Sequence, residues 1–132
     1  MKRTHIVAAI ILNSAKTHLF ITKRPDHVHK GGFWEFPGGK VESDETSQQA
    51  MKRELFEELG IEVTELSLFE QFSFDYPEKK LKFDFYEVTQ FNAEPYGKEG
   101  QESQWVAIET LAQFTFPEAN RPIVEKVQKK YR

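Results

Sequence analysis

The sequence predicts an α/β fold in which helices flank a mixed β-sheet. One observation predicts this fold, and a second predicts the number of domains. Strand-like runs occur on both sides of one strongly marked helix near the middle of the chain. No internal repeat, low-complexity tract or Ser/Pro-rich linker divides the 132 residues, a length typical of one domain. We therefore expect residues 1–132 to form a single domain.

The first third of the chain predicts three strands. Residues Thr4–Leu12, rich in Ile, Val and Ala, predict a buried strand, and His18–Thr22 predicts its hairpin partner. After a polar loop, Phe33–Pro37 predicts a short aromatic strand. We expect Pro37-Gly38-Gly39 to end that strand.

The marked helix has clear signals at both ends. Thr46, with Gln49 three residues later, forms the pattern of a capping box. Gly60 stands where a left-handed C-cap belongs. Between them, apolar residues recur at helical spacing: Ala50, Met51, Leu55 and Leu59.

The second half predicts a hairpin and a final helix. Residues Phe72–Tyr76 and Leu81–Phe85 alternate between apolar and polar, around a turn at Pro77–Lys80. Beyond the hairpin we expect a loop, a short strand and a helix, over residues 90–101, 105–108 and 122–131.

Composition excludes several classes of function. The chain has no cysteine, which excludes a disulfide scaffold, a thiol nucleophile and a Cys-ligated metal. A net charge of −3 argues against stable nucleic-acid binding. The apolar run Ile6–Leu12 is far shorter than the roughly twenty residues that span a membrane. No export signal is visible, so we expect a cytoplasmic protein that does not bind membranes.

Three glutamates carry the chemical signal of the helix. Glu54, Glu57 and Glu58 lie at i, i+3 and i+4, so their side chains emerge from one side. The residues alone leave two interpretations open. One is an acidic solvated face paired with Lys52 and Arg53; the other is a set of oxygen ligands for Mg²⁺ or Mn²⁺.

A longer pattern around these glutamates favours the second interpretation. With each residue type matched about one time in twenty, seven fixed positions coincide by chance on the order of 10⁻⁹ per register, before the aliphatic positions Leu55 and Ile61 are counted. On this pattern the sequence resembles the Nudix hydrolase family. The matching positions are Gly39, Glu45, Arg53-Glu54-Leu55, Glu57-Glu58 and Gly60-Ile61. Further matching stretches are Ile21–Arg24, Glu35–Lys40, Gly97–Gln101 and Ala119-Asn120 with Pro122.

The resemblance implies an α/β/α sandwich whose motif forms a loop–helix–loop. It also implies metal-dependent attack of water on a nucleoside triphosphate, which releases a monophosphate and pyrophosphate. We expect Mg²⁺ as the cofactor, with Mn²⁺ also accepted. The implied metal ligands are the Gly39 carbonyl and the carboxylates of Glu54, Glu57, Glu58 and Glu99.

The resemblance also implies roles for residues around the metal. Arg53 would orient the carboxylates of the motif. Glu54 and Glu99 are both candidates for the general base, and we prefer Glu54. Glu45 fits a catalytic role and a structural role equally well, because it belongs to the motif and its charge also suits a helix N-terminus.

Asn120 carries the information about substrate. As a residue on its own it is a candidate N-cap for the last helix. The resemblance instead makes it the residue that recognises an oxidised guanine. In 8-oxoguanine the N7 atom carries a proton beside the O6 acceptor, and a carboxamide offers the complementary acceptor and donor.

Further substrate contacts follow from the same resemblance. Arg24 and Lys40 would bind phosphate, and Phe36 would lie against the base. Glu78 occupies a base-proximal turn, and His29 would touch the sugar or a phosphate. The spacing of His27 and His29 also allows a weak metal pair, although no further ligand lies nearby.

We expect hydrolysis of 8-oxo-dGTP and related oxidised guanine nucleotides, before a polymerase can incorporate them into DNA. Two alternatives stay open. One is a Nudix hydrolase of another pyrophosphate, such as a dinucleoside polyphosphate, a nucleotide sugar or an RNA 5′ end. The other is a non-catalytic nucleotide-binding module. The expected partner is a small nucleotide; the sequence does not indicate an oligomeric state, and a monomer is compatible with it.

Overall fold

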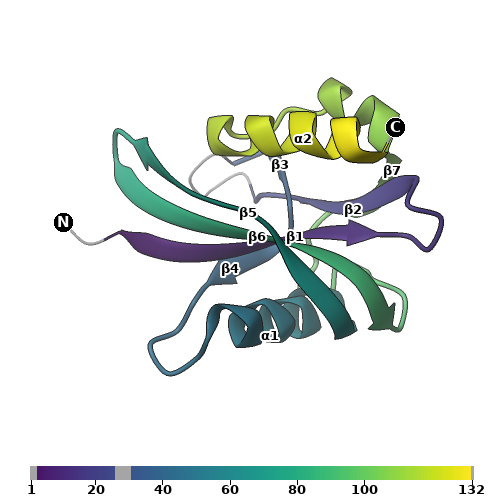
Figure 1. The fold of residues 1–132 in the computed structure, drawn as a ribbon, viewed down its shortest axis with the longest axis horizontal. Helices are drawn as coiled ribbons and strands as arrows, with labels where there is room; N and C mark the ends of the chain where they lie inside the picture. The colour runs from purple at the N-terminus through teal and green to yellow at the C-terminus, as the bar shows by residue number, and fades with distance from the viewer. Residues whose placement is uncertain (1–2, 26–30, 132) are drawn as a thin grey trace.

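The structure is a computed structural model that describes residues 3–25 and 31–131. Its described strands form one sheet (Figure 1). They are β1 (Thr4–Leu12), β2 (His18–Lys23), β3 (Trp34–Glu35), β4 (Gly38–Lys40), β5 (Glu62–Tyr76), β6 (Lys79–Asn92) and β7 (Ser103–Ala107). The helices are α1 (Ser47–Leu59), α2 (Arg121–Tyr131) and the 3₁₀ helices η1 (Ile108–Gln113) and η2 (Glu118–Asn120).

The sheet is mixed, which confirms the predicted fold class. Its main path runs β3-β2-β1-β6-β5, with β4 also paired to β1 and β7 to β2. Strand β1 runs parallel to β6 and antiparallel to β2 and β4. Helix α1 lies in the connection between β1 and β6, as parallel neighbours require a long crossover.

Two helical layers cover the sheet. Helix α1 lies on one face and α2 on the other (Figure 1). Successive side chains of β1 point to opposite faces, so its buried residues divide between two cores. Val7, Ala9 and Ile11 pack in the core under α1, and their alternating neighbours in the core under α2. This burial on both faces explains why β1 is apolar without interruption from Ile6 to Leu12.

The predicted ends of α1 are confirmed. The Gln49 N–H donates to the Thr46 hydroxyl at 3.1 Å, and the Thr46 N–H donates to the Gln49 side chain at 2.8 Å. Gly60 ends the helix in the left-handed region with φ 71°. The four predicted apolar positions are all fully buried, so α1 is fixed on the sheet along its length.

The glycines after β3 differ from the prediction. Gly38-Gly39 does not simply end a strand; it lies in β4, with Gly38 opposite Ala8 of β1. A Cβ at Gly38 would overlap the Val7 carbonyl, so only glycine allows this close approach. The hairpin is also longer than predicted. Strand β6 begins at Lys79 and continues to Asn92, into the predicted turn and loop.

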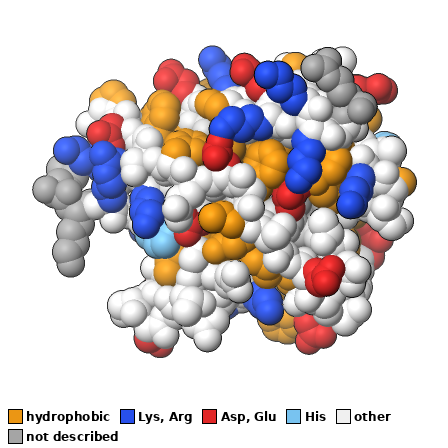
Figure 2. Space-filling model, in the orientation of Figure 1, with side chains coloured by type: hydrophobic (Ala, Val, Ile, Leu, Met, Phe, Trp, Pro, Cys, Tyr) orange, Lys and Arg blue, Asp and Glu red, His pale blue; other side chains and the backbone are white. Residues whose placement is uncertain are grey.

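Acidic and basic side chains are interspersed on the face in Figure 2, with no continuous area of one charge. No helix within the described ranges is long and apolar enough to cross a membrane.

A buried carboxylate ties the start of α1 to the sheet. Asp84, only 2% exposed, accepts hydrogen bonds from Ser47 at 2.6 Å and Gln71 at 2.7 Å, and its other contact is His5 Nε2 at 2.7 Å. Burial raises the pKa of Asp84, but these hydrogen bonds outweigh it and leave the pKa lowered. The cluster joins β1, β5, β6 and α1.

We expect Asp84→Asn to lower the free energy of unfolding by about 2 kcal/mol, because it removes charge-assisted hydrogen bonds from buried partners. Stabilisation by the ionised form is present above its ordinary pKa of 3.8 and is lost as pH falls through the lowered value. Urea unfolding between pH 3 and 7 measures both effects. Asp75→Asn, at an exposed ion pair with Arg3, is the matched control and should change stability little. Equal stabilities for the two variants would contradict the prediction.

Candidate functional site

Two adjoining hollows lie beside β3 and β4. The first, here called the aromatic pocket, has a volume of about 260 Å³. The second, here called the acidic pocket, has a volume of about 490 Å³. The aromatic pocket is lined by Phe36, Tyr76, Lys79, Phe83 and Asn120, among others. The acidic pocket is lined by Thr22, Glu35, Glu58, Glu99 and Gln101, among others.

One ion pair joins the two pockets. Arg24 follows β2 and Glu35 lies in β3, and both side chains line both pockets. The Arg24 guanidinium donates to Glu35 at 2.7 Å. Burial raises the pKa of Glu35, which the neighbouring Arg24 only partly offsets. A ligand that occupies both pockets would therefore pass this pair.

The end of α1 and a distant loop are held together at the acidic pocket. The Glu58 carbonyl accepts hydrogen bonds from the Lys98 N–H and from the Gln101 side chain, each at 3.0 Å. The Gln101 side chain also accepts from the Glu99 N–H at 2.9 Å. A Cβ at Gly97 would overlap the Gln101 carbonyl, so the tight loop requires glycine there. These contacts bring Glu99 beside Glu58, although 41 positions separate them.

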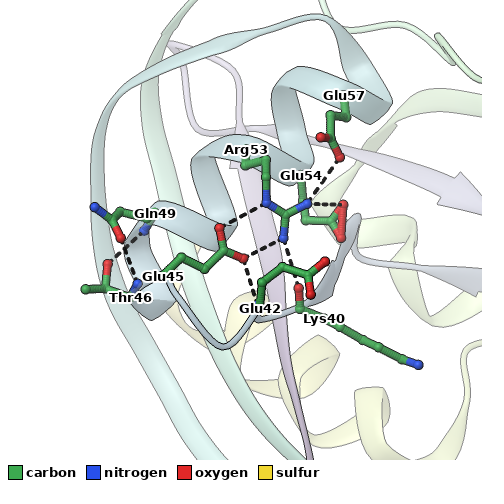
Figure 3. A network of polar contacts seen from close by, with 8 residues as sticks. All are labelled: Lys40, Glu42, Glu45, Thr46, Gln49, Arg53, Glu54 and Glu57. Atoms are coloured by element: carbon green, nitrogen blue, oxygen red, sulfur yellow. Dashed lines mark hydrogen bonds and ion pairs between the residues drawn. The ribbon is translucent and has the colours of Figure 1, made fainter.

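Arg53 organises the exposed side of α1 (Figure 3). Its guanidinium makes a bidentate pair with Glu45 at 3.0 and 2.6 Å, and donates to the Lys40 carbonyl at 3.1 Å. It also reaches Glu54 at 3.5 Å and Glu57 at 3.2 Å. The hydrogen bonds from Arg53 are the main reason that the pKa of Glu45 falls to about 2. In this geometry Glu45 acts on the site by fixing Arg53.

Glu54 and Glu58 form a pair of carboxyl groups that disfavours full ionisation. Burial raises the pKa of both, and each is linked to the other by a hydrogen bond. For Glu58 burial and then the neighbouring Glu54 raise the pKa to about 9. A divalent cation between the two groups would favour their ionised forms, because its positive charge compensates the charges of neighbouring buried carboxylates.

Gly39 completes the surroundings of Glu54. A Cβ at Gly39 would overlap the Glu54 carboxylate, so the glycine opens the space in which that carboxylate lies. Hard divalent cations prefer oxygen ligands, so the carboxylates of these glutamates and the Gly39 carbonyl are of a suitable chemical type. As they stand, however, no three acidic or histidine side chains of residues 3–25 and 31–131 converge closely enough to hold an ion. Glu57 instead faces Arg53 and is half exposed (Figure 3).

Asn120 is one of the residues that line the aromatic pocket. It is the last residue of η2 and only 7% exposed, and α2 begins at the next residue. The neighbouring Ala119 N–H donates to the Tyr76 hydroxyl at 3.0 Å, which fixes this segment on the end of β5. The described part of the chain contains no hydrogen-bond partner for the Asn120 carboxamide, so here it does not cap the helix.

Only some of the other predicted substrate contacts line the aromatic pocket. Phe36 lines the aromatic pocket, but its ring stacks on Phe116 inside the core. Lys40 is exposed at the edge of the same pocket. Glu78 is exposed at the hairpin turn and is not among the residues that line either pocket. His29, like His27, lies outside the described residues.

Sequence reasoning gave no role to several residues that line the two pockets. Lys79, beside Glu78, lines the aromatic pocket in its place. Thr22, Glu35 and Gln101 line the acidic pocket. All four stand in or beside stretches that the sequence singled out, but none has a spacing that distinguishes it from a strand or loop residue.

Comparisons with known proteins show the family to which the chain belongs. A sequence model of the NUDIX domain matches residues 7–126, so the chain belongs to the Nudix family. It is a Nudix hydrolase, and these enzymes generally need a divalent cation.

The relatives narrow the kind of hydrolase. The chain is 40% identical to an 8-oxo-dGTP diphosphatase of Escherichia coli, over 98% of this chain and 99% of that one. It is 34% identical to a CTP pyrophosphohydrolase of E. coli, over 95% and 91%. A solved structure from a study of MutT of Aliivibrio salmonicida and Vibrio cholerae has a TM-score of 0.89 and 55% identity, covering 98% of this chain and all of that one.

Proposed function

We propose that this chain hydrolyses 8-oxo-dGTP, with water, to 8-oxo-dGMP and pyrophosphate. One observation carries the proposal: an acidic pocket for a cation and phosphates adjoins an aromatic pocket lined by the buried Asn120, whose carboxamide makes no hydrogen bond within residues 3–25 and 31–131. Relatives with this activity at 40% identity support it. In a cell, the reaction would remove an oxidised nucleotide before it enters DNA.

The cation in this proposal is Mg²⁺, with Mn²⁺ as an accepted substitute. The carboxylates of Glu54, Glu57, Glu58 and Glu99 and the Gly39 carbonyl would hold it, and of these Glu58 and Glu99 line the acidic pocket. When bound, it would neutralise the polyphosphate, lower the pKa of the attacking water and stabilise the departing pyrophosphate. The overlapping hydrogen bonds of Gln101 would keep Glu99 at the end of α1.

Residues of the chain would act as general base, position the carboxylates and bind phosphate. Glu54 would take the proton of the attacking water at a carboxylate oxygen, with Glu99 as the other candidate base. Arg53 would hold Glu54 and Glu57 in place from the solvent side (Figure 3). Arg24, between the two pockets, would bind phosphate while the base lies among the aromatic side chains.

Asn120 would select the base. Its carbonyl would accept from the N7 proton of 8-oxoguanine, and its amino group would donate to O6. Guanine lacks the N7 proton and would leave two acceptors facing each other. Sites that depend on such buried hydrogen bonds reject the analogue by about 10⁴-fold.

The test is kcat/KM with Mg²⁺ for 8-oxo-dGTP and dGTP in parallel, with the products identified. We expect a preference of at least several hundredfold for 8-oxo-dGTP and release of pyrophosphate. The CTP pyrophosphohydrolase relative makes CTP the third substrate to measure. Faster turnover of CTP than of 8-oxo-dGTP would keep the hydrolase chemistry and overturn the substrate.

The proposal includes the domain organisation and the place of action. Residues 1–132 would act as one domain, which the sheet and the match over residues 7–126 support. The place of action would be the cytoplasm, where the nucleotide pool is used for replication.

A further inference from the structure

Thr22 is buried in the sheet, and no residue of the described ranges 3–25 and 31–131 hydrogen-bonds its hydroxyl. It lies in β2, opposite Glu35 of β3 and Ser103 of β7. The residue is 2% exposed, and within the described ranges its Oγ1 is the single side-chain polar atom that is fully shielded from solvent and lacks a partner. Such a group destabilises a fold, so its presence needs a reason.

The surroundings of Thr22 indicate what the hydroxyl contacts. It lines the acidic pocket together with Glu35, Glu58 and Glu99. Two basic side chains also line it, and each is paired with a carboxylate: Arg24 with Glu35 and Lys23 with Glu102. Glu58 and Glu99 then supply the negative charge that favours a cation. A hydroxyl both donates and accepts, so it can bond a water molecule that accompanies the cation.

We propose that the Thr22 hydroxyl forms part of the cation site, where it hydrogen-bonds a water molecule of the hydrated divalent cation held by Glu58 and Glu99. Mg²⁺ in proteins keeps several of its waters, and hydrogen bonds to the outer shell of a metal site change affinity by about 10- to 100-fold. This inference rests on the cation site of the proposed function and not on the identity of the nucleotide.

The test compares Thr22→Val with Thr22→Ser. Valine keeps the shape of threonine and removes the hydroxyl, whereas serine keeps the hydroxyl and removes a methyl group. The measurement is Mn²⁺ binding without nucleotide, with Glu58→Gln as the reference that loses the site. We expect Thr22→Val to weaken Mn²⁺ binding about 10-fold or more. Thr22→Ser should bind Mn²⁺ nearly as the natural protein does.

Thermal unfolding without metal separates this role from a structural one. We expect the midpoint of Thr22→Val to stay unchanged or to rise, because a buried hydroxyl without a partner is replaced by a methyl group. Thr22→Ser should unfold at a lower temperature, because it leaves a small cavity.

Three results would overturn the inference. They are unchanged Mn²⁺ affinity in Thr22→Val, a lower midpoint in that variant together with weaker binding, and no Mn²⁺ binding by the natural protein. Because no nucleotide is present, these results do not depend on whether 8-oxo-dGTP is the substrate. A failed substrate test would therefore leave this measurement intact.

Discussion

Glu54→Gln is expected to lower kcat for 8-oxo-dGTP by about 10³-fold or more. The substitution removes a carboxylate that lies against Gly39, is hydrogen-bonded to Glu58 and is reached by Arg53. Glutamine keeps the size of the side chain but can neither take a proton from water nor neutralise a cation. Single-turnover kinetics at saturating Mg²⁺, with nucleotide binding measured separately, checks the effect on chemistry.

A matched substitution controls for the loss of a helical glutamate. Glu125→Gln changes an exposed residue of α2, away from both pockets, and should leave kcat within about twofold. Glu99→Gln tests the other candidate base. If Glu54→Gln retained full activity while Glu99→Gln lost it, Glu99 would be the base and Glu54 would leave the mechanism.

Asn120→Ala is expected to reduce the preference for 8-oxo-dGTP over dGTP by about 10²-fold or more. The variant removes the carboxamide that distinguishes the protonated N7 from an acceptor. The loss should fall mainly on kcat/KM for 8-oxo-dGTP, because dGTP gains nothing from a carboxamide that it cannot match. Parallel kcat/KM measurements on both nucleotides provide the ratio.

The alternative for Asn120 is a purely structural role at the start of α2. Thermal unfolding of Asn120→Ala, beside the exposed Asn92→Ala as control, reports on that role. An unchanged nucleotide ratio with a lower unfolding midpoint would assign Asn120 to the fold and contradict its role in selecting the base.

The sequence by itself determined the elements whose signals are local. Strand β1 has the predicted bounds, because a run of seven apolar residues can only be buried on both faces. Helix α1 has the predicted caps, because Thr46, Gln49 and Gly60 act on neighbouring backbone groups. The family also follows from sequence, since its motif lies within one loop and one helix.

Only the tertiary structure decided the features that depend on distant contacts. Gly38 forms a strand because β1 approaches it closely, a contact that no local pattern predicts. By its sequence, Glu45 fits a structural role and a catalytic role equally well. Only its bidentate pairing with Arg53 shows that it positions that arginine. Thr22 has the sequence pattern of an ordinary strand residue, and its hydroxyl becomes notable only where β2, α1 and the Glu99 loop meet. Sequence patterns report on residues a few positions apart, whereas burial and charge at a site are set by side chains from several elements.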